Sequence, residues 1–161
     1  MKDEIESSIK NVIEKLKRFK NKKILFFCIG NILKGDDGVG EYIYKRIHNK
    51  RENVLKINGG NAPLNYIGKI QQLLPEVVII IDSIDSKNIP GYVIFTTLNS
   101  IYSSPIDTHS GLLKEFINTL TFNNDWYILG IQPQILQGVN KISDIVRSTA
   151  DKIIEFINKE F

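Results

Sequence analysis

The hydrophobic residues of this chain follow two patterns, one typical of helices and one typical of buried strands. Near the N-terminus, apolar residues recur three or four positions apart and predict an amphipathic helix over about residues 4–20, which should pack on the rest of the molecule. Further along, β-branched and aromatic residues form short continuous runs. These runs predict five strands, at residues 24–29, 54–57, 77–81, 92–98 and 126–131.

Helix-like segments lie between most of these strands, at residues 39–48, 64–74, 111–120 and 143–161, and Ser143 and Asp144 are candidate caps for the last one. Pro90-Gly91 predicts a turn, so the third and fourth strands are expected to join without a helix. Strands that alternate with helices imply right-handed crossovers. The expected fold is therefore an α/β three-layer sandwich, with a mostly parallel, five-stranded twisted sheet flanked by helices and the 77–81 strand at its centre.

Composition narrows this picture to one soluble domain. The 161 residues predict a single domain spanning 1–161, and 42% hydrophobic with 24% charged residues argues against disorder. The net charge of +3 is small and much of the lysine lies in the first 23 residues, so no nucleic-acid partner is expected. The basic stretch 15–23 more simply complements the dipole of the first helix, although an RNA-binding arm is an alternative.

Two further features bear on the cellular setting. No apolar run approaches the roughly 20 residues that span a bilayer, so no membrane contact is expected. The chain has no hydrophobic signal core at its start, and its single cysteine, Cys28, cannot form an intramolecular disulfide. These features predict a reducing, cytoplasmic setting. The protein is also expected to be a monomer.

Candidate chemistry concentrates after the first strand, in the sequence CIGNILKGDDGVG of residues 28–40. Gly30 and Gly35 have the spacing of a phosphate-binding loop, but Asp36 and Asp37 stand where that motif has lysine and serine or threonine, and two carboxylates repel phosphate. The same carboxylates suit a cation or a general base. A helix cap with a turn is the simpler structural alternative.

Two more candidates lie elsewhere along the chain. Asp82 directly follows the most hydrophobic predicted strand, with Asp85 as a competitor, and His109 precedes a predicted helix. Ligands of parallel α/β sheets bind beyond the carboxyl ends of the strands. Each residue alone could be structural, but Asp37, Asp82 and His109 together could hold a divalent transition metal with coordination positions left open for substrate. The other histidine, His48, is expected to be exposed to solvent.

The chain resembles the hydrogenase maturation endopeptidases, which remove the C-terminal extension of the large subunit of [NiFe] hydrogenases. The matching stretches are residues 30–33 (GNIL), 36–40 (DDGVG), Gly59-Gly60 with Pro63 and Asn65, the strand ending at Asp82, and His109. Each stretch is short, but their order and their positions at strand ends make the combination specific. Residues 130–133 (GIQP) further resemble the branch that serves formate-hydrogenlyase-type and deazaflavin-reducing hydrogenases.

The resemblance implies that Asp37, Asp82 and His109 are the catalytic and metal-recognition residues. It also implies that the nickel is supplied by the large-subunit precursor, which is the expected partner, so that no permanent cofactor is needed. Three features depart from the family pattern: Cys28 stands where glycine is common, Asp107 stands where threonine is common, and the N-terminal helix lies before the usual family start. Cys28 is expected to be buried rather than a metal donor.

Several interpretations stay open at this point. Either the metal polarises the scissile carbonyl or a carboxylate activates the attacking water. A hydrolase carrying its own Zn²⁺ or Mn²⁺ and a nickel chaperone that does not cut its partner are the alternative functions. Nucleotide binding is an alternative suggested by fold class alone, and the acidic loop weakens it.

Overall fold

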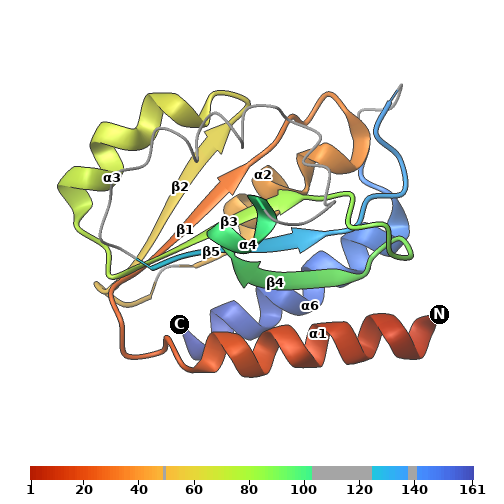
Figure 1. Cartoon of the computed structure of the whole chain (residues 1–161), viewed down its shortest axis with the longest axis horizontal. Helices are drawn as coiled ribbons and strands as arrows, with labels where there is room; N and C mark the ends of the chain where they lie inside the picture. The colour runs from red at the N-terminus through yellow and green to blue at the C-terminus, as the bar shows by residue number, and fades with distance from the viewer. Residues whose placement is uncertain (49, 103–124, 138–140) are drawn as a thin grey trace.

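The computed structural model describes residues 1–48, 50–102, 125–137 and 141–161. Its centre is a five-stranded sheet in the order β2-β1-β3-β5-β4 (Figure 1). The strands are β1 (Ile24–Ile29), β2 (Val54–Gly60), β3 (Val77–Ser83), β4 (Val93–Thr97) and β5 (Asp125–Ile131). All neighbouring pairs are parallel except β4 with β5, which is antiparallel. The expected mostly parallel sheet with residues 77–81 at its centre is confirmed.

The antiparallel strand follows from the turn at Pro90-Gly91. Gly91 has φ +81°, a backbone conformation that favours glycine. The chain reverses there and enters β4 without the long crossover that a parallel strand requires. The sequence prediction of a direct connection between the third and fourth strands is therefore confirmed.

The helices cover both faces of the sheet. They are α1 (Lys2–Lys17), α2 (Val39–Arg46), α3 (Ile67–Leu73), α4 (Leu98–Tyr102) and α6 (Asp144–Glu160), with short 3₁₀ helices η1 (Gly35–Gly38) and η2 (Pro63–Tyr66). The helix expected at 64–74 thus begins as a 3₁₀ turn, and the one expected at 111–120 lies outside the described residues. No helix in the described ranges is long and apolar enough to cross a bilayer.

Alternation along the strands produces the three layers. In β1, Ile24, Phe26 and Cys28 belong to the hydrophobic cluster that includes α1, α2 and α6, whereas Leu25 and Phe27 belong to the opposite cluster with α3 and α4. Because successive side chains of a strand point to opposite faces, both faces must be hydrophobic when both are covered. This explains why the predicted strands lack polar alternation.

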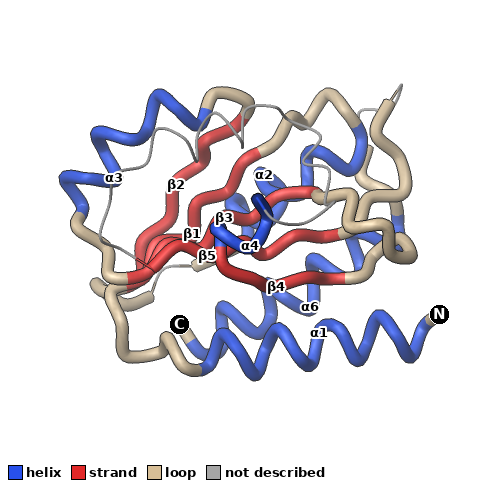
Figure 2. The backbone as a smooth tube through the Cα atoms, in the orientation of Figure 1, coloured by secondary structure: helices blue, strands red, loops and turns tan. Residues whose placement is uncertain are grey.

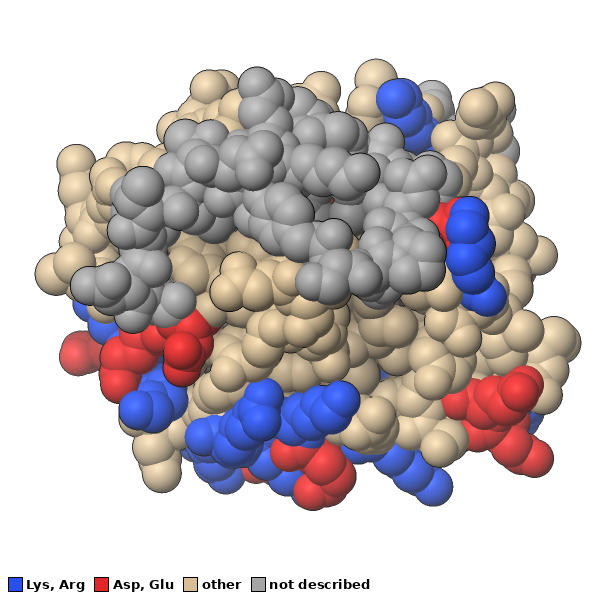
Figure 3. Space-filling model, in the orientation of Figure 1, with Lys and Arg blue, Asp and Glu red and all other residues tan. Residues whose placement is uncertain are grey.

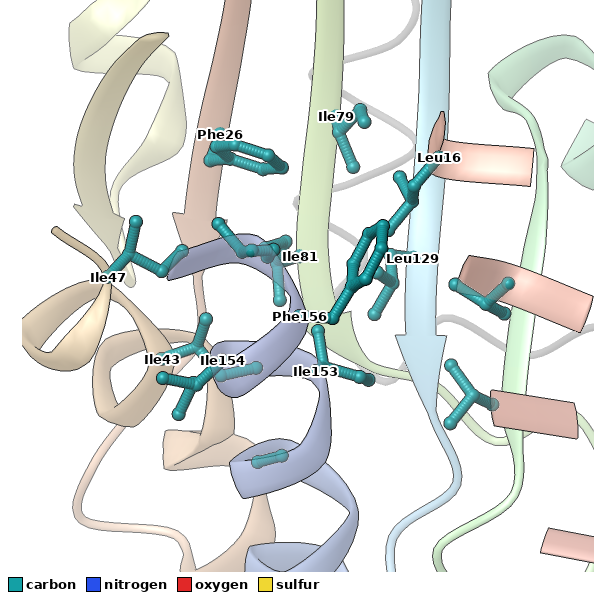
Figure 4. Close-up of a cluster of buried hydrophobic side chains, with 14 of the residues drawn as sticks. Leu16, Phe26, Ile43, Ile47, Ile79, Ile81, Leu129, Ile153, Ile154 and Phe156 are labelled. Atoms are coloured by element: carbon teal, nitrogen blue, oxygen red, sulfur yellow. The ribbon is translucent and has the colours of Figure 1, made fainter. Parts of the chain in front are cut away.

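The larger core lies between the sheet and α6. Figure 4 shows Ile79 and Ile81 of β3 beside Leu129 of β5, facing Ile153 and Phe156 of α6. All five side chains are buried, and burying each contributes about 1.5–3 kcal/mol. This packing supports the central strand on which Asp82 lies.

Helix α1 also covers the outer side of β4, which is an edge strand within the described part of the sheet. The Val93 N–H donates to Ser8 Oγ at 3.1 Å, and Lys15 Nζ donates to the Phe95 carbonyl at 3.4 Å. These two backbone groups would otherwise be the free hydrogen-bonding groups of an edge strand. The N-terminal helix, which had no role in the sequence analysis, therefore protects this edge.

The lysines near the N-terminus do not form a uniformly positive surface. In Figure 3, Lys and Arg gather along the lower edge, over α1, with acidic side chains among them. Ion pairs join Lys17 to Glu14 at 2.6 Å and Lys20 to Glu160 at 2.8 Å. Such exposed pairs contribute little to stability. The acidic partners do interrupt the positively charged surface over α1. The absence of a nucleic-acid partner stays a prediction.

Replacing Ser8 tests the role of α1 at the sheet edge. Ser8→Ala leaves the buried Val93 N–H without its acceptor, so we expect the free energy of unfolding to fall by about 1–3 kcal/mol in urea titrations. Ser7→Ala is the matched control, because Ser7 is the exposed neighbour on the same helix. Equal stability of the two variants would contradict the edge-protection role.

Candidate active site

The carboxyl ends of the strands carry the residues singled out by the sequence. Figure 2 shows that loops gather at this end of the sheet. The loop after β1 contains Asp37 within the short helix η1, and Asp82 lies one residue before the end of β3. Since β1 and β3 are neighbours, the two acids are delivered to the same edge.

Gly30 brings these two acids together. It has φ +130°, and a side chain here would place its Cβ 2.0 Å from the Asp37 carbonyl oxygen and 3.5 Å from Asp82 Oδ1. The Asn31 N–H donates to both the carbonyl oxygen of Asp37 at 3.1 Å and its Oδ2 at 3.0 Å. The loop therefore closes over Gly30, and only a residue without a side chain fits between Asp37 and Asp82.

Ser83 connects the two carboxylates. Its backbone N–H donates to Asp82 Oδ1 at 2.8 Å, while its hydroxyl donates to Asp37 Oδ1 at 3.2 Å. Ser83 is only 1% exposed, so its bond to Asp82 is buried, while its bond to the half-buried Asp37 is partly buried. The sequence analysis missed this residue, and its one signal was a small polar side chain next to an acid at a strand end.

The electrostatics of the pair are asymmetric. Asp82 is buried, and burial, followed by the nearby negative charge of Asp37, raises the pKa of Asp82 well above its usual value. The Ser83 N–H opposes the shift because it stabilises the charged form. Two neighbouring carboxylates in a poorly solvated place repel each other, and a proton or a cation relieves that repulsion.

The third expected donor, His109, lies outside the described residues. Within residues 1–48, 50–102, 125–137 and 141–161, no group of three His, Cys, Asp or Glu side chains could hold a metal ion. The structure therefore brings together two of the three candidates, Asp37 and Asp82. The role of His109 stays a prediction.

Asp36 has a different role from its neighbour Asp37. Its fully buried carboxylate accepts bonds from the N–H groups of Gln134 at 2.7 Å and Ile135 at 2.8 Å. Ser143 adds two more, from its N–H at 2.7 Å and its hydroxyl at 3.0 Å. Asp36 thus clasps the loop after β1 to the segment that leads into α6, a long-range role that the sequence did not reveal.

This clasp corrects one sequence-based expectation. Ser143 does occupy the position before the first turn of α6, but it makes no side-chain capping hydrogen bond. Its hydroxyl donates to Asp36 instead, since a buried carboxylate is a strong hydrogen-bond acceptor. Asp144 stands in the first turn, where its charge complements the helix dipole.

The competing acid, Asp85, belongs to its own turn. A hydrogen bond from Lys87 Nζ, with an N–O separation of 2.5 Å, is the main reason that the pKa of Asp85 is lowered to about 2. Gln132 Nε2 also donates to Asp85 at 3.2 Å. The side-chain oxygen Oε1 of Gln132 accepts hydrogen bonds from the N–H groups of Ser86 and Asn88. Within the Gly-Ile-Gln-Pro stretch, Gln132 therefore holds the turn that follows Asp82.

The remaining candidates lie away from the acids. Cys28 is fully buried in the hydrophobic cluster with Phe26, and burial raises the pKa of its thiol. It is a core residue, as expected, rather than a metal donor. His48 is exposed, and its backbone N–H donates to Asn158 Oδ1 on α6.

Removing the Asp36 carboxylate should loosen the clasp. Asp36→Ala leaves three buried or partly buried N–H groups and one hydroxyl without their acceptor, so we expect the free energy of unfolding to fall by about 3 kcal/mol or more in urea titrations. Asp144→Ala is the control, because that exposed acid should lose less than about 1 kcal/mol. A similar loss in both variants would contradict the clasp.

The raised pKa of Asp82 predicts a stabilising substitution. A carboxyl whose pKa is higher in the folded state makes folding less favourable as pH rises from its unfolded value, near 4, through its folded value. Asn resembles the protonated acid, so Asp82→Asn should raise the free energy of unfolding at pH 7.5 by about 1 kcal/mol or more in urea titrations. The gain should disappear below about pH 4, where the acid is protonated in both states.

Asp85→Asn is the control of opposite sign. The pKa of Asp85 is lowered to about 2, so its charge stabilises the fold above pH 4 and that contribution is lost as pH falls towards 2. Asp85→Asn should therefore destabilise the protein at pH 7.5. A destabilised Asp82→Asn variant at the same pH would show that the Asp82 charge is not under strain.

Comparison with known proteins identifies the family. The model of the hydrogenase maturation protease (HycI) family matches residues 39–160, a range that holds Asp82 and His109 and begins two residues after Asp37. The hydrogenase 3 maturation protease of Escherichia coli K12 is 31% identical over 121 residues, which are 70% of this chain and 74% of that protein.

Solved structures agree with this match. The crystal structure of the [NiFe] hydrogenase maturation protease HycI from Thermococcus kodakarensis KOD1 has a TM-score of 0.77 at 25% identity, covering 89% of this chain and 96% of that chain. The solution structure of the endopeptidase HycI from Escherichia coli has a TM-score of 0.74 at 26% identity, covering 84% of this chain and 89% of that chain. This chain, with its paired acids at the carboxyl edge of the sheet, belongs to the hydrogenase maturation protease family and is a peptidase.

Proposed function

We propose that this peptidase removes the C-terminal extension of a [NiFe] hydrogenase large-subunit precursor and recognises the nickel already inserted in that precursor. Asp37, Asp82 and His109 are the proposed protein donors to the nickel. The observation that carries the proposal is the meeting of Asp37 and Asp82 around Gly30, at the edge of the sheet where ligands of α/β folds bind.

Electrostatics explain why the signal should be a cation. Burial and Asp37 together disfavour the charged form of Asp82. A divalent ion held by the substrate removes that penalty, because it interacts favourably with both carboxylates at once. In the free enzyme, the two neighbouring carboxylates therefore repel each other when both are ionised. Nickel-loaded substrate supplies the positive charge that compensates this repulsion. Substrate without nickel supplies no such compensation and should bind weakly.

The reaction itself is hydrolysis of one peptide bond. Coordination of the precursor's nickel fixes the scissile peptide beside Asp37 and Asp82, which replaces a random encounter with a defined geometry. Water then adds to the carbonyl carbon, the C–N bond breaks, and the leaving amine takes a proton. The products are the mature subunit with a new carboxylate and the free C-terminal peptide.

Incubation of the purified chain with nickel-loaded precursor tests this function. Mass spectrometry should detect a released C-terminal peptide, and the same precursor without nickel should stay intact. Asp37→Asn, Asp82→Asn and His109→Ala should each lower the rate by about 100-fold or more, since each removes a donor to the nickel. Circular dichroism should show that the three variants remain folded.

Two matched substitutions control for loss of any acid or histidine. Asp85→Asn removes the acid bound to Lys87, and His48→Ala removes the exposed histidine, so both variants should still release the peptide. Normal cleavage by Asp37→Asn or His109→Ala would remove those residues from the proposed site. Stable binding of the precursor without any cleavage by the wild type would instead favour the nickel chaperone. Zinc or manganese in protein purified without added metal, with cleavage that does not depend on nickel, would favour the hydrolase with its own metal.

A further inference from the structure

Exposed hydrophobic side chains gather beside the candidate active site. Five large hydrophobic residues are exposed in the described part of the chain: Met1, Ile32, Leu33, Leu74 and Ile135. Ile32 and Leu33 belong to the loop that carries Asp37, and they are 45% and 64% exposed. Ile135 is 37% exposed, and its carbonyl accepts the N–H of Asp36 in that loop at 2.8 Å. Three of the five therefore stand at the rim of the site, a concentration typical of a protein-binding surface.

A groove continues from this rim between α2 and the start of α6. It has a volume of about 360 Å³, and Ile32 and Gly38 of the acid-bearing loop line it together with Tyr42 and Ile142. Gly38 directly follows Asp37 in the chain, so the groove begins at the loop that carries this acid. The lining by Ile32, Tyr42 and Ile142 offers an apolar floor for a side chain of a bound partner.

The rim of the groove carries an excess of positive charge. Lys45, Arg46, Lys141 and Arg147 line it, and Glu41 is the one acidic lining residue among those that the structure describes. Glu41 pairs with Lys45 at 2.7 Å, and the Arg147 guanidinium pairs with Asp144 just outside the groove, also at 2.7 Å. The Tyr42 hydroxyl also donates to the nearby Asp151 at 2.7 Å, so the four cations outnumber the acids Glu41, Asp144 and Asp151 by one. An acidic partner segment would complement this charge.

Contacts with Tyr42 restrict the position of the Arg46 side chain. Its guanidinium lies 3.7 Å from the centre of the Tyr42 ring, and one of its nitrogens donates to the Tyr42 carbonyl at 3.2 Å. An arginine with a restricted position loses less conformational freedom when it binds a carboxylate, and its planar group can hold both carboxylate oxygens.

The two walls of the groove are fixed to each other by the Asp36 clasp. Asp36 precedes the wall formed by Gly38 and α2, and its partner Ser143 directly follows Ile142 in the opposite wall. The groove is therefore formed before any partner arrives. Preformed sites spend less binding free energy on ordering.

We propose that this groove and the exposed residues Ile32, Leu33 and Ile135 form the docking surface for the precursor large subunit, and that they bind a surface segment with an apolar side chain flanked by carboxylates. The inference rests on the proposed function, since it names where that substrate binds. Docking here would bring the precursor to the edge of the sheet where Asp37 and Asp82, two of the proposed donors to its nickel, lie. The surface then contributes to selection of the precursor separately from the nickel, through apolar and charge complementarity.

Charge reversal and apolar truncation test the docking surface. The double variant Arg46→Glu/Lys141→Glu and the variant Leu33→Ser should each raise Kd and KM for nickel-loaded precursor from the same organism by about 10-fold, with kcat unchanged at saturation. Raising the salt concentration should weaken binding by the wild type much more than binding by the double variant, because screening acts on the charges that the variant has removed.

Matched controls lie elsewhere on the surface. Lys10→Glu on α1 reverses an exposed charge, and Leu74→Ser removes the exposed hydrophobic residue that follows α3, so both should bind and cleave like the wild type. Unchanged Kd in both groove variants, with a wild type that cleaves, would overturn the docking surface and leave the proposed function standing. If the wild type binds the precursor without cutting it, the proposed function fails, while the Kd values still decide the docking surface.

Discussion

The structure of the site depends on a close approach between the Asp37 backbone and residue 30, which is possible because residue 30 is glycine. A Cβ at Gly30 would lie 2.0 Å from the Asp37 carbonyl oxygen, so any other residue would push the loop away from the strand end. With glycine, the loop folds back and places Asp37 next to Asp82. Ser83 then holds both acids through one N–H and one hydroxyl. The backbone conformation at Gly30 thus brings the two acids together, and the hydrogen bonds from Ser83 then hold their side chains.

This arrangement places an unfavourable charge pair at the end of the most buried strand. Burial and the charge of Asp37 raise the pKa of Asp82, which means that the ionised pair is under electrostatic strain. Hydrophobic packing of β3 between its neighbours, and of α6 over the sheet, keeps the strand end in place despite that strain. Strain of this kind is typical of functional sites, and a cation brought by the substrate is the partner that would relieve it.

The Asp36 clasp links the acids to the surface around them. The Asp36 carboxylate accepts four hydrogen bonds from Gln134, Ile135 and Ser143, which join the acid-bearing loop to the start of α6. The groove with its basic rim lies between those two parts, and Ile32 and Gly38 of the acid-bearing loop line it. Asp36 therefore stabilises the fold, while its neighbour Asp37 faces the candidate active site. In this proposal, chemistry and substrate selection share one rigid framework.

The layout of the molecule could be predicted from the order of its residues. Uninterrupted hydrophobic runs predicted the five strands, the missing polar alternation of residues 77–81 predicted the central one, and Pro90-Gly91 predicted the direct connection into β4. Asp37 and Asp82 were found because strand ends of a parallel sheet meet at one edge, and residue spacing carries that information. Other features became visible only in the folded chain: the different tasks of Asp36 and Asp37, the bridging by Ser83, the bond from Ser143 to Asp36, and the pairing of Ser8 with the edge of β4. The hydrogen bonds from Ser83, Ser8 and Ser143 join residues that are 46 to 107 positions apart in the chain. The different tasks of Asp36 and Asp37 depend on which way each side chain points from one short 3₁₀ helix. Local patterns of hydrophobicity specify neither kind of feature.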